Sequence, residues 1–179
     1  MYLSREAILK AIDRGDINVS PFEPELLGAA SLDLRLDRAF RRLEVTDSPL
    51  DLTPEKDYRD PEISTPLVLG DGESLEIASG ETVLGITLER LTLSPRICGR
   101  LEGRSRFARL GLLIHISASF VAPGTDNQQV LEIANLSPRP LRLHPGVAIG
   151  QCVFARMEGQ ASHQGRYRRQ TLEDFIASP

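Results

Sequence analysis

The chain has 179 residues, of which 41% are hydrophobic and 26% charged, as in an ordinary globular domain rather than a disordered chain. Its formal net charge of −4 disfavours a general nucleic-acid scaffold, and no apolar run is long enough to cross a bilayer. The N-terminal segment is amphipathic and carries acidic residues, unlike a signal peptide. We therefore expect one cytoplasmic domain over residues 1–179, with no nucleic-acid or membrane partner.

The first third of the chain carries clear capping and periodicity signals. Ser4 is a suitable N-cap, and an apolar stripe with helical spacing follows it as far as Gly15, which predicts a short helix. Residues 31–45 alternate between apolar and charged side chains, which predicts a half-buried strand. Residues 46–66 are polar and rich in proline, so we expect a long surface loop there.

From residue 67 onward, short apolar runs alternate with turn residues. Residues 67–93 predict three short strands, and residues 128–137 predict another. Residues 141–157 predict a hairpin about Pro145–Gly146, a pair suited to a tight turn. Many short strands with regular turns indicate an all-β barrel or sandwich rather than βαβ units.

The cysteines and histidines do not have the spacing of a zinc site. Cys98 and Cys152 lie far apart in sequence, so we expect two reduced, buried thiols, with a single disulfide as the alternative. The chain has three histidines and no HxE followed by CxxC, so a zinc deaminase has no ligand set here. Hydrolytic chemistry in this chain would have to run without bound zinc.

Residues 97–135 contain the strongest candidate for a functional site. Four arginines fall within ten residues there: Arg100, Arg104, Arg106 and Arg109. Guanidinium groups suit phosphate because they donate paired hydrogen bonds and keep their charge. The chain has 19 arginines and 2 lysines, however, so this crowding is partly compositional. Gly103 and Ser105 strengthen the phosphate hypothesis, because small residues let backbone N–H groups approach an anion.

Glu132 is a single carboxylate within the apolar run VLEI. It could be an outward-facing strand residue paired with an arginine. Alternatively, its apolar neighbours would partly desolvate it, as suits a general base. Ser105 by itself does not indicate a nucleophile, because no Ser–His–Asp or Cys–His arrangement can be argued from these spacings.

Several motifs together resemble one family. They are GRLEGRSRFARLGLLIH, a Pro-Gly turn, VLE, LHPGVAIGQ and GRYRRQ, with GAASLDLRL and VLGITLERLTL upstream. Over nearly the whole chain they resemble the dCTP deaminase family of the dUTPase-like superfamily. The resemblance implies an all-β, distorted jelly-roll or barrel with a short N-terminal helix, which forms a homotrimer with active sites between subunits. It also implies zinc-independent hydrolytic deamination of dCTP to dUTP and ammonia, in dUTP and dTTP biosynthesis, with Mg²⁺ on the triphosphate.

The resemblance also implies roles for individual residues. Glu132 would be the general acid/base, assisted by Ser105 and Arg109, and His115 matches a histidine tied to dTTP feedback, so dTTP inhibition is a hypothesis. Residues 166–179 would form a tail over the triphosphate, and the sequence leaves open whether it is ordered without ligand. The substrate-binding positions would be Arg104, Ser105, Arg106, Phe107, Ala108, Arg109, Ala118, Val130, Leu131, Glu132, Gln151, Arg166, Tyr167 and Gln170.

The chain departs from the family pattern at informative positions. Ala122 replaces the aspartate that contacts the sugar 3′-hydroxyl in superfamily relatives and positions the attacking water in the triphosphatases. This replacement argues against diphosphatase activity. Arg106 replaces the usual second serine, and ASHQG stands where Pro-Tyr-Gly is usual. Two alternatives therefore stay open: a bifunctional dCTP deaminase and dUTP diphosphatase, and a catalytically silent nucleotide-binding homologue.

Overall fold

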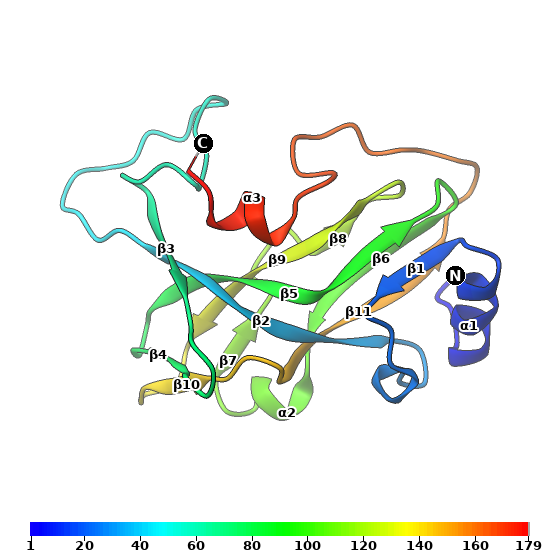
Figure 1. The fold of residues 1–179 in the computed structure, drawn as a ribbon, viewed down its shortest axis with the longest axis horizontal. Coiled ribbons are helices and arrows are strands. Elements are labelled where there is room, and N and C mark those ends of the chain that lie inside the picture. The colour runs from blue at the N-terminus through cyan, green and yellow to red at the C-terminus, as the bar shows by residue number, and fades with distance from the viewer. Residues whose placement is uncertain (179) are drawn as a thin grey trace.

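The central strand of the fold is β2 (Leu32–Leu43), which begins with the alternating segment. Leu32, Leu34 and Leu36 are fully buried while Asp33 and Arg35 are half-buried, so the predicted alternation is confirmed. A computed structural model describes residues 1–178 and shows a curled antiparallel sheet with short helices outside it (Figure 1). The mostly-β architecture with a short N-terminal helix agrees with the sequence prediction.

The main sheet has the strand order β7-β9-β5-β2-β11-β6-β8, with β1 added on β5 and β3 on β2. Strands β4 and β10 form a separate two-stranded sheet. The elements are α1 (Arg5–Asp13), β1 (Ile17–Ser20), η1 (Pro24–Leu26), β2 (Leu32–Leu43), β3 (Ser64–Val68), β4 (Leu75–Ile77), β5 (Thr82–Leu93), β6 (Ile97–Gly103), α2 (Ser105–Ala108), β7 (Leu112–Ile114), β8 (Phe120–Val121), β9 (Asp126–Asn135), β10 (Leu141–Leu143), β11 (Ala148–Arg156) and α3 (Leu172–Ile176).

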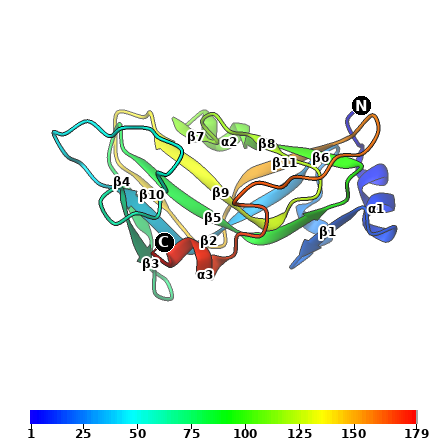
Figure 2. The same cartoon turned by 90° about the horizontal axis from the view of Figure 1, so that it is seen from above.

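Register shifts interrupt three of the strand pairings. They fall between Leu36 and Phe40 where β2 meets β5, between Ile86 and Arg90 where β5 meets β9, and after Ala148 in β11. Extra residues on one strand increase local twist and bend the sheet. The shifts therefore account for the curl that is visible in two orthogonal views (Figures 1 and 2).

The N-terminal helix forms where the sequence predicts it. Ser4 Oγ accepts a hydrogen bond from the Ala7 N–H at 3.4 Å, and Ile8 and Ala11 are buried against the sheet. The chain turns away at Gly15, whose φ of +72° is a conformation that glycine adopts without strain. Among the described residues, no helix is long and apolar enough to cross a membrane.

The predicted hairpin over residues 141–157 is wrong, although its turn forms. Gly146 has a φ of +81°, as a tight turn requires, but β10 pairs with β4 instead of β11. Both edges of β11 are already occupied, because Gln151 is paired with Asp33 of β2 and with Glu102 of β6. A central strand of this kind has no free edge for its sequence neighbour.

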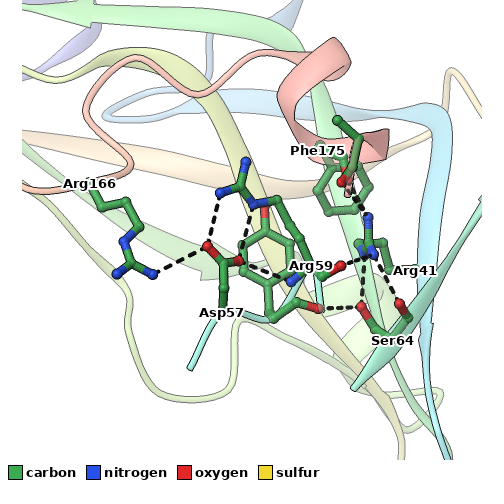
Figure 3. A network of polar contacts seen from close by, with 8 residues as sticks. Arg41, Asp57, Arg59, Ser64, Arg166 and Phe175 are labelled. Carbon is green, nitrogen blue, oxygen red and sulfur yellow. Dashed lines mark hydrogen bonds and ion pairs between the residues drawn. The ribbon is translucent and has the colours of Figure 1, made fainter. Parts of the chain in front are cut away.

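The polar segment 46–66 is packed more closely at its end than a surface loop would be. The guanidinium of Arg41, itself fully buried, donates to Ser64 Oγ at 2.7 Å and to the carbonyl oxygens of Arg59 and Phe175 at 2.9 and 2.8 Å (Figure 3). Ser64 is fully buried and begins β3. One arginine of β2 thus ties the segment and the C-terminal tail to the sheet.

The C-terminal tail ends in the helix α3, which the sequence did not predict. Thr171 and Asp174 form a capping box at its start, and Phe175 is fully buried beside Ala39 and Ile86. Burial of one large aromatic side chain stabilises such a short helix more than its intrinsic propensity does.

The cysteines are both free thiols, as predicted. Cys152 is fully buried, and burial raises the pKa of its thiol to about 12. Cys98 is only half-buried, so the prediction of two buried thiols holds for one of the pair.

Candidate active site

A cavity of about 390 Å³ opens where β9, the loop after β7 and the C-terminal tail meet. Glu132 is the only carboxylate among the described residues that line it. The lining is otherwise aromatic, aliphatic and neutral polar, which suits an organic ligand held by a few directed polar contacts. The lining residues are Tyr58, Leu84, His115, Ala118, Phe120, Val121, Ala122, Thr125, Asn127, Gln128, Gln129, Val130, Glu132, His163, Tyr167 and Gln170.

Glu132 faces this cavity because of its place in the β9 alternation. Val130 and Glu132 line the cavity, whereas Leu131 and Ile133 are fully buried in the core on the opposite face. The Ser117 backbone N–H donates to Glu132 Oε2 at 2.8 Å. One carboxylate oxygen is therefore fixed by the backbone, and Oε1 is the oxygen that remains for a ligand or a water.

His115 contacts Glu132 twice. Its Nδ1 accepts the Glu132 backbone N–H at 3.1 Å, and its Nε2 lies 3.6 Å from Glu132 Oε1. Burial lowers the pKa of His115, although the Glu132 charge and a hydrogen bond to the Ala118 backbone oppose that shift. An accepting Nδ1 places the proton of the neutral ring on Nε2, the nitrogen that faces the carboxylate.

Two buried polar atoms at the cavity have no hydrogen-bond partner within residues 1–178: Tyr58 Oη and Gln170 Nε2. Burial raises the pKa of Tyr58 well above its usual range, so the phenol keeps its proton and can donate. Buried polar groups are nearly always paired, and an orphaned donor in a cavity indicates where a ligand would bind.

The C-terminal tail, residues 167–170, forms one wall of the cavity by pairing with the start of β9. The backbone N–H groups of Asp126 and Gln128 donate to the carbonyls of Arg168 and Gln170 at 2.9 and 3.1 Å. The Asn127 side chain donates to the Tyr167 carbonyl at 2.7 Å. This pairing places Tyr167 and Gln170 in the cavity wall, at the sequence motif that predicted ligand contact.

The arginine motif forms a separate turn around α2. Gly103 and Gly111 bracket it, and both positions require glycine. A Cβ on Gly103 would lie 2.8 Å from the Ile114 carbonyl oxygen, while Gly111 has a φ of +88° and lies against the Ser137 backbone. Between them, Ser105, Arg106, Ala108 and Arg109 are exposed, so this turn presents a hydroxyl and two guanidiniums to solvent.

Arg104 is held more tightly than its neighbours in the turn. Its guanidinium lies 2.9 Å from Asp33 Oδ2 and donates to the Ala148 carbonyl at 3.0 Å. Burial raises the pKa of Asp33, and the charge of Arg104 opposes that shift. Gln151 lies beside this pair on β11 and donates to the Gly103 carbonyl at 3.2 Å.

Within one chain, the predicted site residues thus form two separate groups. The cavity is lined by His115, Ala118, Val130, Glu132, Tyr167 and Gln170. Arg166 lies in the C-terminal tail beside Tyr167 and does not line this cavity. The α2 residues and Gln151 lie elsewhere, and Figures 1 and 2 show α2 and α3 on opposite sides of the sheet. The side chain of Leu131 lies in the core rather than in either group.

Sequence reasoning missed Ser117 and Tyr58. Ser117 acts mainly through its backbone N–H, which any residue but proline supplies, and its hydroxyl adds only a longer contact of 3.4 Å to the same oxygen, so its identity carries little signal. Tyr58 reaches the cavity only because the segment 46–66 folds back under the tail, a long-range contact that local sequence does not reveal.

Comparison with known proteins gives the fold class and the family. The Staphylococcus bacteriophage 80alpha dUTPase shares the fold, with a TM-score of 0.50 and 11% identity over 84% of this chain and 88% of that one. A 2′-deoxycytidine 5′-triphosphate deaminase from Agrobacterium tumefaciens gives a TM-score of 0.65 with 20% identity over 87% of this chain, which spans 48% of that protein. The fold is therefore of the dUTPase-like class.

The sequence comparisons are more specific. The family model described as dCTP deaminase-like matches residues 2–157. Proteins named "dCTP deaminase, dUMP-forming" are 41% identical over 164 residues in Nocardioides sp. and 38% identical over 161 residues in Corynebacterium glutamicum. These matches cover 91% and 90% of this chain, respectively, and 84% of each relative. The chain belongs to the dCTP deaminase-like family.

Proposed function

We propose that this protein hydrolytically deaminates dCTP, with Glu132 as the general acid/base. The observation that carries the proposal is the position of Glu132: it is the only carboxylate among the described cavity residues, and Ser117 and His115 orient it. General acid/base catalysis needs a proton-transferring side chain within reach of both the attacking water and the leaving amine, and a carboxylate can fill this role.

The proposed reaction uses Glu132 twice. Its carboxylate takes a proton from water as the oxygen adds to cytosine C4, and the same proton is then delivered to the departing amino group, so dCTP and water give dUTP and ammonia. Ser117 holds Oε2, which leaves Oε1 to face the water. Neutral His115 directs a polar N–H toward Glu132 without adding a second charge.

The arginine turn would complete this site from a second copy of the chain. Ser105 and Arg109 are exposed and lie outside the cavity of their own chain, as expected for groups that act on a neighbour. We infer a homotrimer, in which Arg104 and Arg106 also approach the neighbour's triphosphate. Mg²⁺ would arrive with the triphosphate as part of the substrate, since it prefers phosphate oxygens and water. Inhibition by dTTP, through a site that includes His115, belongs to the same proposal.

The product distinguishes two candidate functions. Ala122 lines the cavity where superfamily relatives have an aspartate, and this favours retention of the triphosphate as dUTP. The names of the relatives at 38–41% identity favour the second candidate, a bifunctional enzyme that continues to dUMP. In that case Glu132, or a carboxylate from another copy, would have to activate a second water for attack on the phosphate chain.

Product analysis tests the proposal directly. The protein is incubated with dCTP, CTP, dCMP or dUTP in the presence of Mg²⁺, and ammonia, pyrophosphate and nucleotide products are quantified. We expect ammonia and dUTP from dCTP, and no pyrophosphate. Ammonia with dUMP and pyrophosphate would establish the bifunctional enzyme instead. Absence of ammonia from every substrate would contradict the proposal and favour a silent nucleotide-binding homologue.

A further inference from the structure

His163 lines the cavity, but the proposed reaction gives it no role. It belongs to the segment 157–165, which joins β11 to the C-terminal tail. The residue is half-buried, and its side chain forms no hydrogen bond or ion pair with any other residue in the described range 1–178. Both ring nitrogens of His163 are therefore available to a ligand in the cavity.

Backbone hydrogen bonds hold the segment that carries His163 against two neighbouring loops. The Ala161 N–H donates to the Pro95 carbonyl at 3.0 Å, and the His163 N–H donates to the Pro123 carbonyl at 2.7 Å. Pro123 follows Ala122, which also lines the cavity. The histidine is therefore anchored through its own backbone beside the turn that precedes β9.

Close packing at two glycines fixes the segment and the imidazole ring. A Cβ on Gly124 would overlap Ser162, and a Cβ on Gly165 would overlap the ring of His163. The ring therefore lies directly against the Gly165 backbone, and only glycine leaves room for this contact. Such packing restricts the orientation of the ring, as a residue that makes a directed contact with a ligand requires.

His163 and Glu132 approach the cavity from opposite ends of β9. The turn that holds His163 leads into the strand at Asp126, whereas Glu132 lies nearer the other end of the strand, Asn135. A strand advances by roughly 3.3 Å per residue, so the two side chains reach the cavity from well-separated points. One ligand can therefore contact Glu132 with one part and His163 with another.

The chemistry of a cytosine nucleotide decides which part would meet His163. In the cytosine ring, N1 carries the sugar and lies directly across from C4, the atom that water attacks. With C4 beside Glu132, the sugar points away from Glu132, toward the start of β9. The only free hydroxyl of a 2′-deoxynucleoside triphosphate is at C3′. A neutral imidazole has one donor and one acceptor, which match a hydroxyl group.

We propose that His163 forms a hydrogen bond with the 3′-hydroxyl of the nucleotide and thereby determines specificity for that hydroxyl. This inference rests on the proposed function, which places the base beside Glu132. Its neighbour Ala122 offers no polar side-chain atom to the cavity. Asn127, at the same end of the cavity, is already engaged, because its amide donates to the Tyr167 carbonyl at 2.7 Å and accepts a hydrogen bond from Gln129.

Two ligands that differ only at C3′ test this contact without turnover. Calorimetry would measure the binding of dCTP and of 2′,3′-dideoxycytidine triphosphate, both with Mg²⁺, to Glu132→Gln and to the same protein carrying a second substitution. Glu132→Gln should prefer dCTP about fivefold, the value of one hydrogen bond. Adding His163→Ala should abolish this preference, and adding His163→Asn should keep part of it, since asparagine retains a donor and an acceptor. The matched control is His144→Ala, because His144 is exposed beside Pro145 and lies outside the cavity.

Two outcomes would overturn the proposal. Equal weakening of both ligands by His163→Ala would assign the histidine to another part of the nucleotide or to support of the segment. Loss of the preference in Thr125→Val but not in His163→Ala would assign the hydroxyl to Thr125, a buried residue of the same cavity. Ammonia release by the wild type separates this inference from the proposed function. If dCTP is deaminated but the preference does not depend on His163, only the inference fails. A preference that depends on His163 in a protein that releases no ammonia would support the contact and refute deamination.

Discussion

The Glu132 backbone N–H donates to His115 Nδ1 at 3.1 Å, while His115 Nε2 lies 3.6 Å from Oε1 of the same glutamate. The first contact fixes the imidazole ring through the backbone of β9, and the second directs its other nitrogen at the carboxylate. Because the ring is buried and its pKa is lowered, it stays neutral near pH 7. The neighbour that the Glu132 carboxylate has on this side is therefore polar but uncharged.

This arrangement predicts a pH dependence of stability. Since the folded state lowers the pKa of His115 below its ordinary 6.5, the unfolded chain binds more protons as the pH falls through that value. The contribution of His115 to stability is therefore complete above about pH 6.5 and declines below it. Denaturant titrations from about pH 7.5 to about pH 5.5 should show a shallower decline for His115→Gln than for the wild type. Parallel curves would contradict this assignment.

Asp57 affects stability in a different pH range from His115. A hydrogen bond from the Arg59 side chain lowers its pKa from 3.8 to about 2, so its contribution is complete above pH 3.8 and is lost only as the pH falls toward 2. A second decline in stability in that acidic range should be smaller in Asp57→Asn. The two residues therefore act in separate pH windows, and each variant serves as the control for the other.

The buried guanidinium of Arg41 predicts a large and local effect on stability. Arg41→Met would leave the buried carbonyls of Ser64 and Phe175 without a donor, at a cost of about 3 kcal/mol in the free energy of unfolding. Arg42 is the neighbouring control, because its side chain is half exposed and pairs with Glu81 at 3.0 Å. Arg42→Met should cost about 1 kcal/mol or less. Urea denaturation would measure both, and equal losses would contradict the anchoring role of Arg41.

Complementation between inactive variants tests whether the arginine turn acts on a neighbouring copy. Glu132→Gln and Ser105→Ala should each lack activity alone. In a mixed oligomer with sites between subunits, equal mixing should restore about one quarter of wild-type sites, since each site then draws its two residues from independent chains. Mixing after denaturation and refolding, followed by an ammonia assay, measures this. No restored activity, despite oligomers that demonstrably exchange subunits, would place both residues in one chain's site.

Local signals in the sequence were sufficient for the elements that depend on near neighbours. Ser4 and the stripe that follows it predicted α1, and the alternation around Leu34 predicted β2. The hairpin prediction about Pro145–Gly146 failed because strand pairing depends on which edges are free, and β11 already lies between β2 and β6. Turn chemistry fixes the turn, but it does not choose the partner strand.

The sequence predicted those site residues whose side-chain type and motif already indicate a role. Glu132 and Gln170 follow from motif and position, and both line the cavity. Tyr58 could not be predicted, because it reaches the cavity through the buried Arg41 contacts that join distant segments. A polar, proline-rich segment gives no local sign that an arginine of β2 will hold it in place.

The measurement that tests the central claim most directly is ammonia release from dCTP by Glu132→Gln. Glutamine keeps the size of the side chain and removes the proton-accepting charge, so we expect kcat to fall at least about a hundredfold while the fold is retained. Glu76→Gln is the matched control, since Glu76 is an exposed carboxylate paired with Arg142 on the separate sheet, and it should keep wild-type activity. A Glu132→Gln protein that releases ammonia at the wild-type rate would contradict the assignment of Glu132 as the acid/base group.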